Sequence, residues 1–159
     1  MSVSCNDFFE LLLLLKLLND EVNHYFGKYS LRLGLSLSEL QILWIVSLSN
    51  ETTFLEIARL TGQSKNEIRE VVTALEADGL VQQIHHSDSP RCTIAATHEG
   101  RSLIGELPSV VDRMCARMKD SQEVQDLLHT SRQVVEVLKG ADYLRLIGNR
   151  VEQMKQVSF

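Results

Sequence analysis

The 159-residue chain contains little proline, little cysteine and no excess of positive charge. Its two prolines, Pro90 and Pro108, leave long stretches in which helices can run without interruption. Its three cysteines are odd in number and lack the paired spacing of a metal site, so we expect neither a disulfide framework nor bound metal. Such cysteine usage is typical of a reducing compartment, and we expect a cytoplasmic protein without a cofactor.

The chain also lacks a segment suited to crossing a membrane. Its leucine-rich start, residues 8–18, has no basic lead-in and is interrupted by Glu10 and Lys16. It is far shorter than the ~20 apolar residues that span a bilayer, so we expect a buried helix and no membrane partner. The motifs of common enzyme classes are missing too, including Gly-x-Ser-x-Gly, His-Glu-x-x-His and a complete phosphate-binding loop. The sequence therefore does not predict an enzyme.

Three helix starts and two extended runs follow one another between residues 36 and 100. Ser36, Thr53 and Ser64 each have a glutamate three residues later, the spacing of a capping box. The extended runs, 80–85 and 92–97, are separated by a polar turn. This order predicts a mainly α protein with a small β-hairpin wing, a winged helix-turn-helix, which usually reads DNA.

Both ends of the chain are apolar at helical spacing. The N-terminal stripe alternates steps of three and four residues, as in helices that face a partner helix. Its members are Phe8, Leu11, Leu15, Leu18, Val22, Tyr25 and Tyr29. Near the other end, Ser121 can cap a helix that Gly140 is expected to bend, and residues 98–119 are expected to form one long helix broken or kinked at Pro108.

Helices this apolar exceed what one lobe of about 65 residues can cover. We therefore predict a two-fold homodimer, the alternative being that the terminal helices fold back onto their own lobe. The expected interface residues are Phe8, Leu11, Leu15, Leu18, Leu144, Ile147 and Val151. The expected parts of this one integrated domain are a dimerisation helix (1–34), a winged lobe (35–100) and further dimerisation helices (101–159).

Helix 64–77 is the predicted reading helix, and its polar face carries the candidate DNA contacts. Arg69 can fork onto guanine, Asn66 can pair with adenine, and Lys65 and the amides beside Ser64 suit phosphate. Glu70 can pair with a nearby cation, accept a bond from cytosine, or mark weakened DNA binding. The full candidate set is Ser64, Lys65, Asn66, Arg69, Glu70 and Thr73 on the helix, with His86, Asp88 and Arg91 on the wing, residues 82–95.

The net negative charge of the predicted winged lobe argues against DNA binding. Residues 56–100 carry four basic and seven acidic side chains, so the basic stripe typical of DNA-binding modules is missing. The alternative function is therefore a winged-helix protein-interaction module, similar to an antirepressor, with weakened or no DNA binding.

Four segments together resemble the MarR family of bacterial regulators. They are Leu35-Ser-Leu-Ser-Glu-Leu-Gln-Ile-Leu43, Phe54-Leu-Glu-Ile-Ala-Arg-Leu-Thr-Gly62, Ser64 to Val81, and Thr97-His-Glu-Gly100. The resemblance covers most of the chain and implies a dimeric transcriptional regulator, most often a repressor, that binds a pseudo-palindromic operator in double-stranded DNA. Asp88 falls where the family keeps a wing aspartate, whereas Pro90 replaces the wing arginine and Arg91 follows one place later.

The resemblance also implies ways to sense a signal. The family commonly holds a small effector between its dimer helices and its winged lobe. Tyr25, Tyr29, Leu33 and Trp44 are the candidates here for a small apolar ligand, with ordinary core packing as the alternative. Some members sense oxidants through an N-terminal cysteine, a role that Cys5 could fill if it is not an inert thiol.

Overall fold

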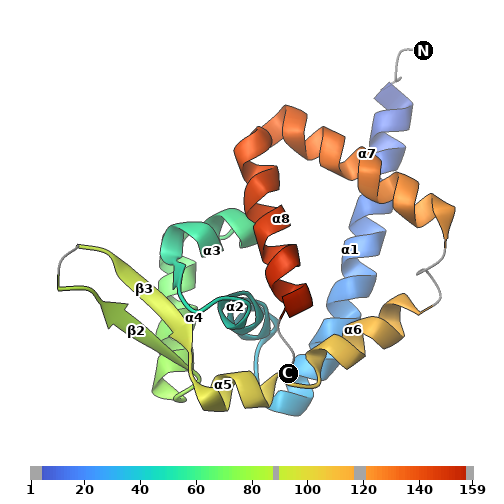
Figure 1. Cartoon of the computed structure of the whole chain (residues 1–159). Helices are drawn as coiled ribbons and strands as arrows, with labels where there is room; N and C mark the ends of the chain where they lie inside the picture. The colour runs from blue at the N-terminus through green and yellow to red at the C-terminus, as the bar shows by residue number, and fades with distance from the viewer. Residues whose placement is uncertain (1–4, 88–89, 117–120, 157–159) are drawn as a thin grey trace. The chain divides into compact units, whose positions relative to one another are not determined.

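The computed structural model describes residues 5–87, 90–116 and 121–156. The chain divides into two compact units, residues 1–40 and 41–159. Figure 1 shows the elements along the chain. In order they are α1 (Cys5–Leu33), α2 (Leu37–Ser47), β1 (Thr52–Thr53), α3 (Phe54–Thr61), α4 (Lys65–Ala77), β2 (Val81–His85), β3 (Cys92–Ala96), α5 (His98–Leu103), α6 (Leu107–Cys115), α7 (Gln122–Lys139) and α8 (Ala141–Gln156). The predicted mainly α fold with a hairpin wing is confirmed.

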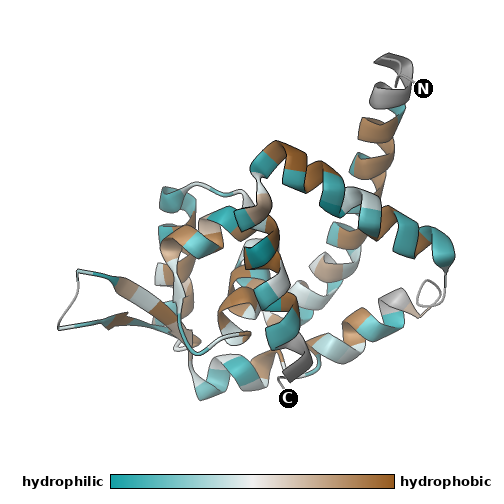
Figure 2. Cartoon of the chain, turned by 45° about the horizontal axis from the view of Figure 1, so that its top comes forward, coloured by the Kyte–Doolittle hydropathy of each residue, from teal (hydrophilic) through white to brown (hydrophobic). Residues whose placement is uncertain are grey.

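The first unit consists of α1 and the start of α2. Gly34 adopts φ 73°, a left-handed conformation that glycine reaches without steric cost, and α1 ends just before it. The predicted capping box follows, with the Ser36 amide donating to Glu39 Oε2 (2.6 Å) and the Glu39 amide donating to Ser36 Oγ (3.2 Å). Apolar turns of α1 are visible as brown ribbon in Figure 2.

The predicted stripe of α1 is largely exposed in the single chain. Leu11, Leu15 and Leu18 are 42%, 44% and 51% exposed, whereas Tyr29 is buried. The side chain of Phe8 lies outside the described part of the chain. Exposed leucines in consecutive turns form an apolar surface of the kind that typically contacts another protein surface.

The second unit is built on a closed apolar core. The two remaining capping boxes, at Thr53–Glu56 and Ser64–Glu67, start α3 and α4 as predicted. α4 buries Ile68, Val72 and Leu75, and α3 buries Ile57 while its Leu55 stays 47% exposed. Among the fully buried side chains are Ile42, Leu43, Val46, Ile57, Ile68, Val72, Leu75, Ile94, Ile104 and Leu107.

The sheet has three antiparallel strands in the order β1-β3-β2. β2 and β3 form the predicted hairpin, with His85 opposite Cys92. The sequence does not predict β1, because Thr53 fits a helix cap and Thr52 carries no strand signal; in the structure, β1 pairs Thr52 with Ile94. Gly100 follows the sheet in α5, where an added Cβ would lie 2.1 Å from the Leu80 carbonyl oxygen, so this position requires glycine.

The C-terminal part corrects two details of the prediction. Of the two alternatives for residues 98–119, a break is found, but it precedes Pro108: α5 ends at Leu103, and Pro108 lies in the first turn of α6, where its missing amide costs no hydrogen bond. Gly140, at φ 87°, does not bend a continuous helix but ends α7 before α8 begins. Ser121 caps α7 as predicted, accepting from the Val124 amide.

α8 contacts α3 of the same unit. The Tyr143 hydroxyl donates to the Arg59 carbonyl oxygen, and Leu144 is half-buried, while Ile147 and Val151 are each 38% exposed. The expected alternative, in which a terminal helix folds back, thus applies in part to α8. Among the described residues, no helix combines the length and apolarity needed to cross a membrane.

Candidate nucleic-acid interface

Local interactions fix the start of the reading helix α4. The Ser64 amide donates to Glu67 Oε2 (2.7 Å), and the Glu67 amide donates to Ser64 Oγ (3.3 Å). Hydrogen bonds to the Glu67 carboxyl from the Ser64 side chain, and next from the Ser64 amide, hold the pKa of this carboxyl below its usual range. The Glu67 charge is therefore directed at the helix start, as the capping-box spacing predicted.

The helix is amphipathic in the predicted sense. Ile68, Val72 and Leu75 are completely buried, and Val71 is half-buried. The opposite face is exposed and consists of Lys65, Asn66, Arg69, Glu70 and Thr73. The Thr73 hydroxyl donates to the Arg69 carbonyl oxygen (2.8 Å), so its hydrogen is used within the helix.

The end of α4 is joined to the start of the wing. Glu76 accepts from the Gln83 amide nitrogen (2.9 Å) and from Gln83 Nε2 (2.8 Å). Two bonds from one side chain fix the angle at which the hairpin leaves the reading helix. The reading helix α4 and the hairpin therefore form one surface, in which the angle between them is fixed.

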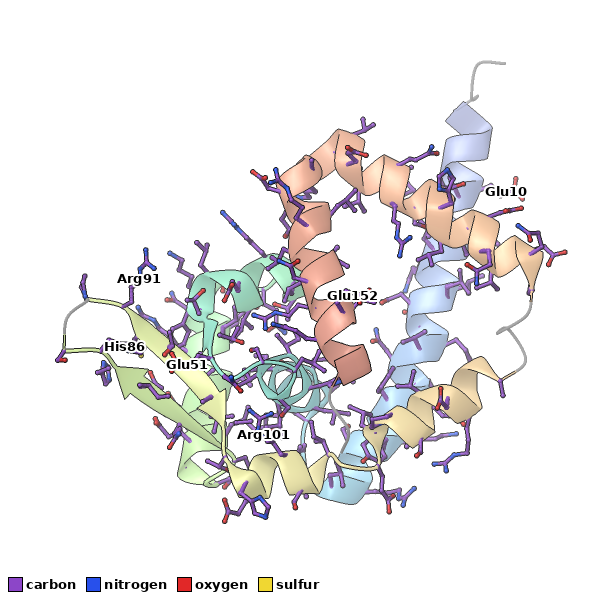
Figure 3. All side chains as sticks on the ribbon, in the orientation of Figure 1. Glu10, Glu51, His86, Arg91, Arg101 and Glu152 are labelled. Carbon is purple, nitrogen blue, oxygen red and sulfur yellow. The ribbon has the colours of Figure 1, made fainter. Side chains whose placement is uncertain are left out.

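His86 directly follows the hairpin strand β2 and is held by side chains from other segments. Its Nε2 is 3.0 Å from Glu51 Oε2 and 3.0 Å from Thr93 Oγ1, and the Thr93 hydroxyl also donates to Glu51 (2.7 Å). The Thr93 hydrogen bond, followed by the His86 charge, lowers the pKa of Glu51. Figure 3 shows His86 beside Glu51 and Arg91 directed away from that pair.

A groove of about 530 Å³ opens between the start of α3, the outer side of α4 and the wing. Its lining comprises Thr53, Phe54, Leu55, Glu56, Lys65, Arg69, Pro90, Arg91 and Cys92. Three predicted DNA contacts, Lys65, Arg69 and Arg91, thus meet in one place. The Arg69 guanidinium lies 5.9 Å from the centre of the Phe54 ring, within the range of a cation–π contact. Asp88 lies outside the described residues.

Sequence reasoning missed several residues of this region, above all Arg150 of α8. Arg150 is only 8% exposed; its Nη2 lies 3.2 Å from Thr52 Oγ1 and 3.5 Å from Glu56 Oε2. The capping-box spacing identifies Glu56, but no local signal links it to an arginine so far along the chain. Phe54 and Glu51 were missed for the same reason, since their partners lie in other elements.

The candidate effector-binding residues differ in how far they are buried. Tyr29 is buried, Leu33 and Trp44 are half-buried, and Tyr25 is 40% exposed. Cys5 begins α1, but its side chain lies outside the described part. Among the described residues, no group of three histidine, cysteine or acidic side chains could hold a metal ion.

Solved structures supply the comparison that decides the fold. No protein-family model and no curated protein matches the sequence. CouR from Rhodococcus jostii RHA1, solved bound to p-coumaroyl-CoA, superposes with a TM-score of 0.70 at 22% identity over 86% of this chain and 95% of its own. The chain has the fold of MarR-family regulators.

Two further structures support the same fold. A MarR-family transcriptional regulator from Silicibacter pomeroyi gives a TM-score of 0.72 at 18% identity, covering 86% of this chain and 95% of that one. A mutant of MarR from E. coli, solved in complex with operator DNA, gives 0.66 at 15% identity, covering 84% and 99%. The winged-helix fold predicted from the sequence thus agrees with the fold of these MarR-family structures.

Proposed function

We propose that this protein is a cytoplasmic, non-enzymatic, dimeric DNA-binding regulator of the MarR family, and a repressor. It reads a pseudo-palindromic operator with helix 64–77 and wing 82–95. The observation that carries the proposal is the exposed polar face of α4, from Lys65 to Thr73, set beside a hairpin that Glu76 holds in place. A MarR with this fold has been solved on operator DNA, which supports the assignment.

The proposed mechanism depends on two copies acting together. A two-fold dimer would place two α4 helices about one turn of DNA, roughly 34 Å, apart in adjacent major grooves. The exposed leucines of α1 support a second copy as its partner. Because both helices must dock at once, a signal that changes their spacing would release the operator.

A small apolar effector is the signal that we propose, with Tyr25, Tyr29, Leu33 and Trp44 as its contacts. The support is the chemistry of three aromatic rings, together with the fact that CouR was solved with an aromatic acyl-CoA. Trp44 is the only tryptophan of the chain, so its fluorescence would report binding directly. Oxidation of Cys5 is the second proposed signal, to be tested by the effect of peroxide on a Cys5→Ser variant.

A protein-interaction role remains the second candidate, because one specific feature favours it. Residues 56–100 have three more acidic than basic side chains, and Glu70 is exposed on the reading helix itself. In that role the polar face of α4 would contact a basic protein surface instead of DNA. The two candidates differ in how they respond to salt, since each neutralised phosphate adds about 0.9 to the slope of log affinity against log salt.

The decisive experiment is to select bound duplexes from a random pool with the purified full chain. We expect enrichment of inverted half-sites about 10 base pairs apart between centres, and an affinity that falls steeply with salt. Recovery of no sequence, together with a flat salt response on duplexes from the protein's own promoter, would favour the interaction module. Enrichment of a single half-site would contradict dimeric reading.

A further inference from the structure

We propose that the groove between α3, α4 and the wing is a seat for the DNA backbone, and that Arg150 of α8 keeps this seat electropositive. The inference rests on the proposed function and reassigns one of its residues. Arg69, which the sequence suggested as a guanine reader, becomes a phosphate contact. Arg150 becomes a positioning residue that acts through Glu56 without touching DNA.

The first step is the convergence of three cations on one groove. Lys65 and Arg69 come from α4, one turn apart, and Arg91 comes from the wing, so the positive charges surround the opening from two elements. A phosphodiester carries one negative charge per nucleotide, which matches such a cluster. The three cations line one concave surface, and a duplex that rests on both α4 and the wing must pass its backbone over it.

The second step is the direction of Arg69. Its guanidinium lies 5.9 Å from the ring of Phe54 at the start of α3, on the groove side of the reading helix. A guanidinium stacked there presents its remaining donors to the groove. Base selection then falls to Asn66 and its exposed neighbours on α4, while Arg69 contributes affinity that does not depend on sequence.

The third step concerns Glu56, the sole carboxylate among the described residues that line the groove. It accepts from the Thr53 amide (2.9 Å) and faces Arg150 Nη2 at 3.5 Å. Arg150 is itself fixed by Thr52 Oγ1 (3.2 Å) and by Gln153 Oε1 (2.9 Å), and it is almost fully buried. A buried, fixed cation beside Glu56 offsets the charge that would otherwise repel a phosphate.

Coupling between the C-terminal helix and DNA binding follows from this arrangement. Any movement of α8 that separates Arg150 from Glu56 would return a negative charge to the lining of the groove. Affinity for every duplex would then fall together, whatever its sequence.

The first test compares Arg69→Gln with Lys65→Gln and Arg91→Gln. Binding of a labelled selected duplex and a labelled random duplex is measured by fluorescence anisotropy between 50 and 200 mM salt. Each variant should lower both affinities by the same factor, about eight-fold near 0.1 M salt, and reduce the salt slope by about 0.9. Lys139→Gln, which removes the same charge from the end of α7, is the matched control and should bind like wild type.

The outcomes separate the two proposals. A wild-type protein that binds no duplex at low salt would overturn both the proposed function and the backbone seat. A wild-type protein that binds, with variants whose salt slopes are unchanged, overturns the seat alone. If Arg69→Gln weakens only the selected duplex, then Arg69 reads a base and the seat is wrong.

The second test is a charge cycle between Arg150 and Glu56. Arg150→Gln should weaken binding to both duplexes, and adding Glu56→Gln should restore it, because glutamine keeps the capping acceptor but carries no charge. Arg150→Lys, which preserves the cation, should stay near wild type. Thermal unfolding of each variant checks that the lobe remains folded.

A purely structural role for Arg150 would give a different pattern. The double variant would then bind as weakly as Arg150→Gln, and that result would overturn the positioning role. If Arg150→Gln does not fold, Glu56→Gln alone decides the question. It should bind both duplexes more tightly than wild type, and unchanged or weaker binding contradicts the inference.

Discussion

The winged lobe and the helix α1 treat their apolar residues in opposite ways. In the lobe, Leu43, Ile68 and Ile94 are completely buried, and Arg101 closes the end of α2 by donating to the carbonyl oxygens of Ser47 (2.6 Å) and Ser49 (3.0 Å). Along α1, by contrast, leucines from Leu11 to Leu18 are 42–65% exposed. The lobe completes its core within one chain, whereas α1 leaves apolar surface that water disfavours.

α7 resembles α1 more than it resembles the lobe. Val137 and Leu138 are 85% and 72% exposed, and the helix has no buried residue among those described. The difference teaches that two kinds of apolar pattern coexist in this sequence. One kind specifies the fold of the chain, and the other suits contact with a further surface, for which we propose a second copy.

The largest expected effect comes from α1. Leu15→Ser should shift the protein from the proposed dimer to a monomer, because a two-fold interface would lose two buried leucines at about 1.5–3 kcal/mol each. That is on the order of 3–6 kcal/mol, or a hundred-fold or more in the dissociation constant. Sedimentation velocity over a concentration series measures it.

Leu31→Ser is the matched control, because Leu31 lies on α1 but off the predicted stripe and is 78% exposed. It should leave the dimer intact. If the Leu15→Ser protein is as dimeric as wild type, the exposed stripe of α1 is not the dimer interface.

A smaller effect is expected in the core of the lobe. Ile68→Ala should lower the free energy of unfolding by about 2–5 kcal/mol, since it opens a cavity at a completely buried position. Val137→Ala on α7 should change it by less than about 0.5 kcal/mol when unfolding is measured at protein concentrations too low for the proposed dimer to form. Chemical denaturation of both variants provides the measurement, and similar losses at the two sites would contradict the comparison.

The smallest effect is expected at the helix caps. Ser64→Ala in the lobe should cost about 1 kcal/mol at pH 7, and Ser121→Ala at the start of α7 tests the same change outside it. Each serine lowers the pKa of a nearby glutamate, Glu67 and Glu123 respectively. A lowered pKa in the folded state adds stability above the ordinary value of 4.5, which is lost as the pH falls through the folded pKa.

The difference between wild type and either alanine variant should therefore shrink below pH 4.5. Unfolding by denaturant at pH 7 and at pH 3.5 measures that difference. If the pH dependence of unfolding is the same with and without Ser64, the serine does not act through Glu67.

Much of the candidate site followed from local sequence. The Ser64–Glu67 box, the inward face of α4 and the strands of the wing were all predicted, because each depends on residues within a turn or a hairpin. Glu67 was also assigned its partner, and the structure confirms that assignment. The sequence left open whether Pro108 breaks or kinks the helix before α6, since a proline can either kink a helix or begin one.

The sequence by itself determined where each helix of the lobe starts and which face it buries. Only the tertiary structure decided that Thr52 pairs with Ile94, that Glu51 holds His86, and that Arg150 reaches Glu56. Helix caps and amphipathic faces depend on residues within one or two helical turns, so the sequence pattern alone predicts them. Residues far apart in the sequence come into contact because the packed core brings their segments together, and their spacing along the chain does not predict these contacts.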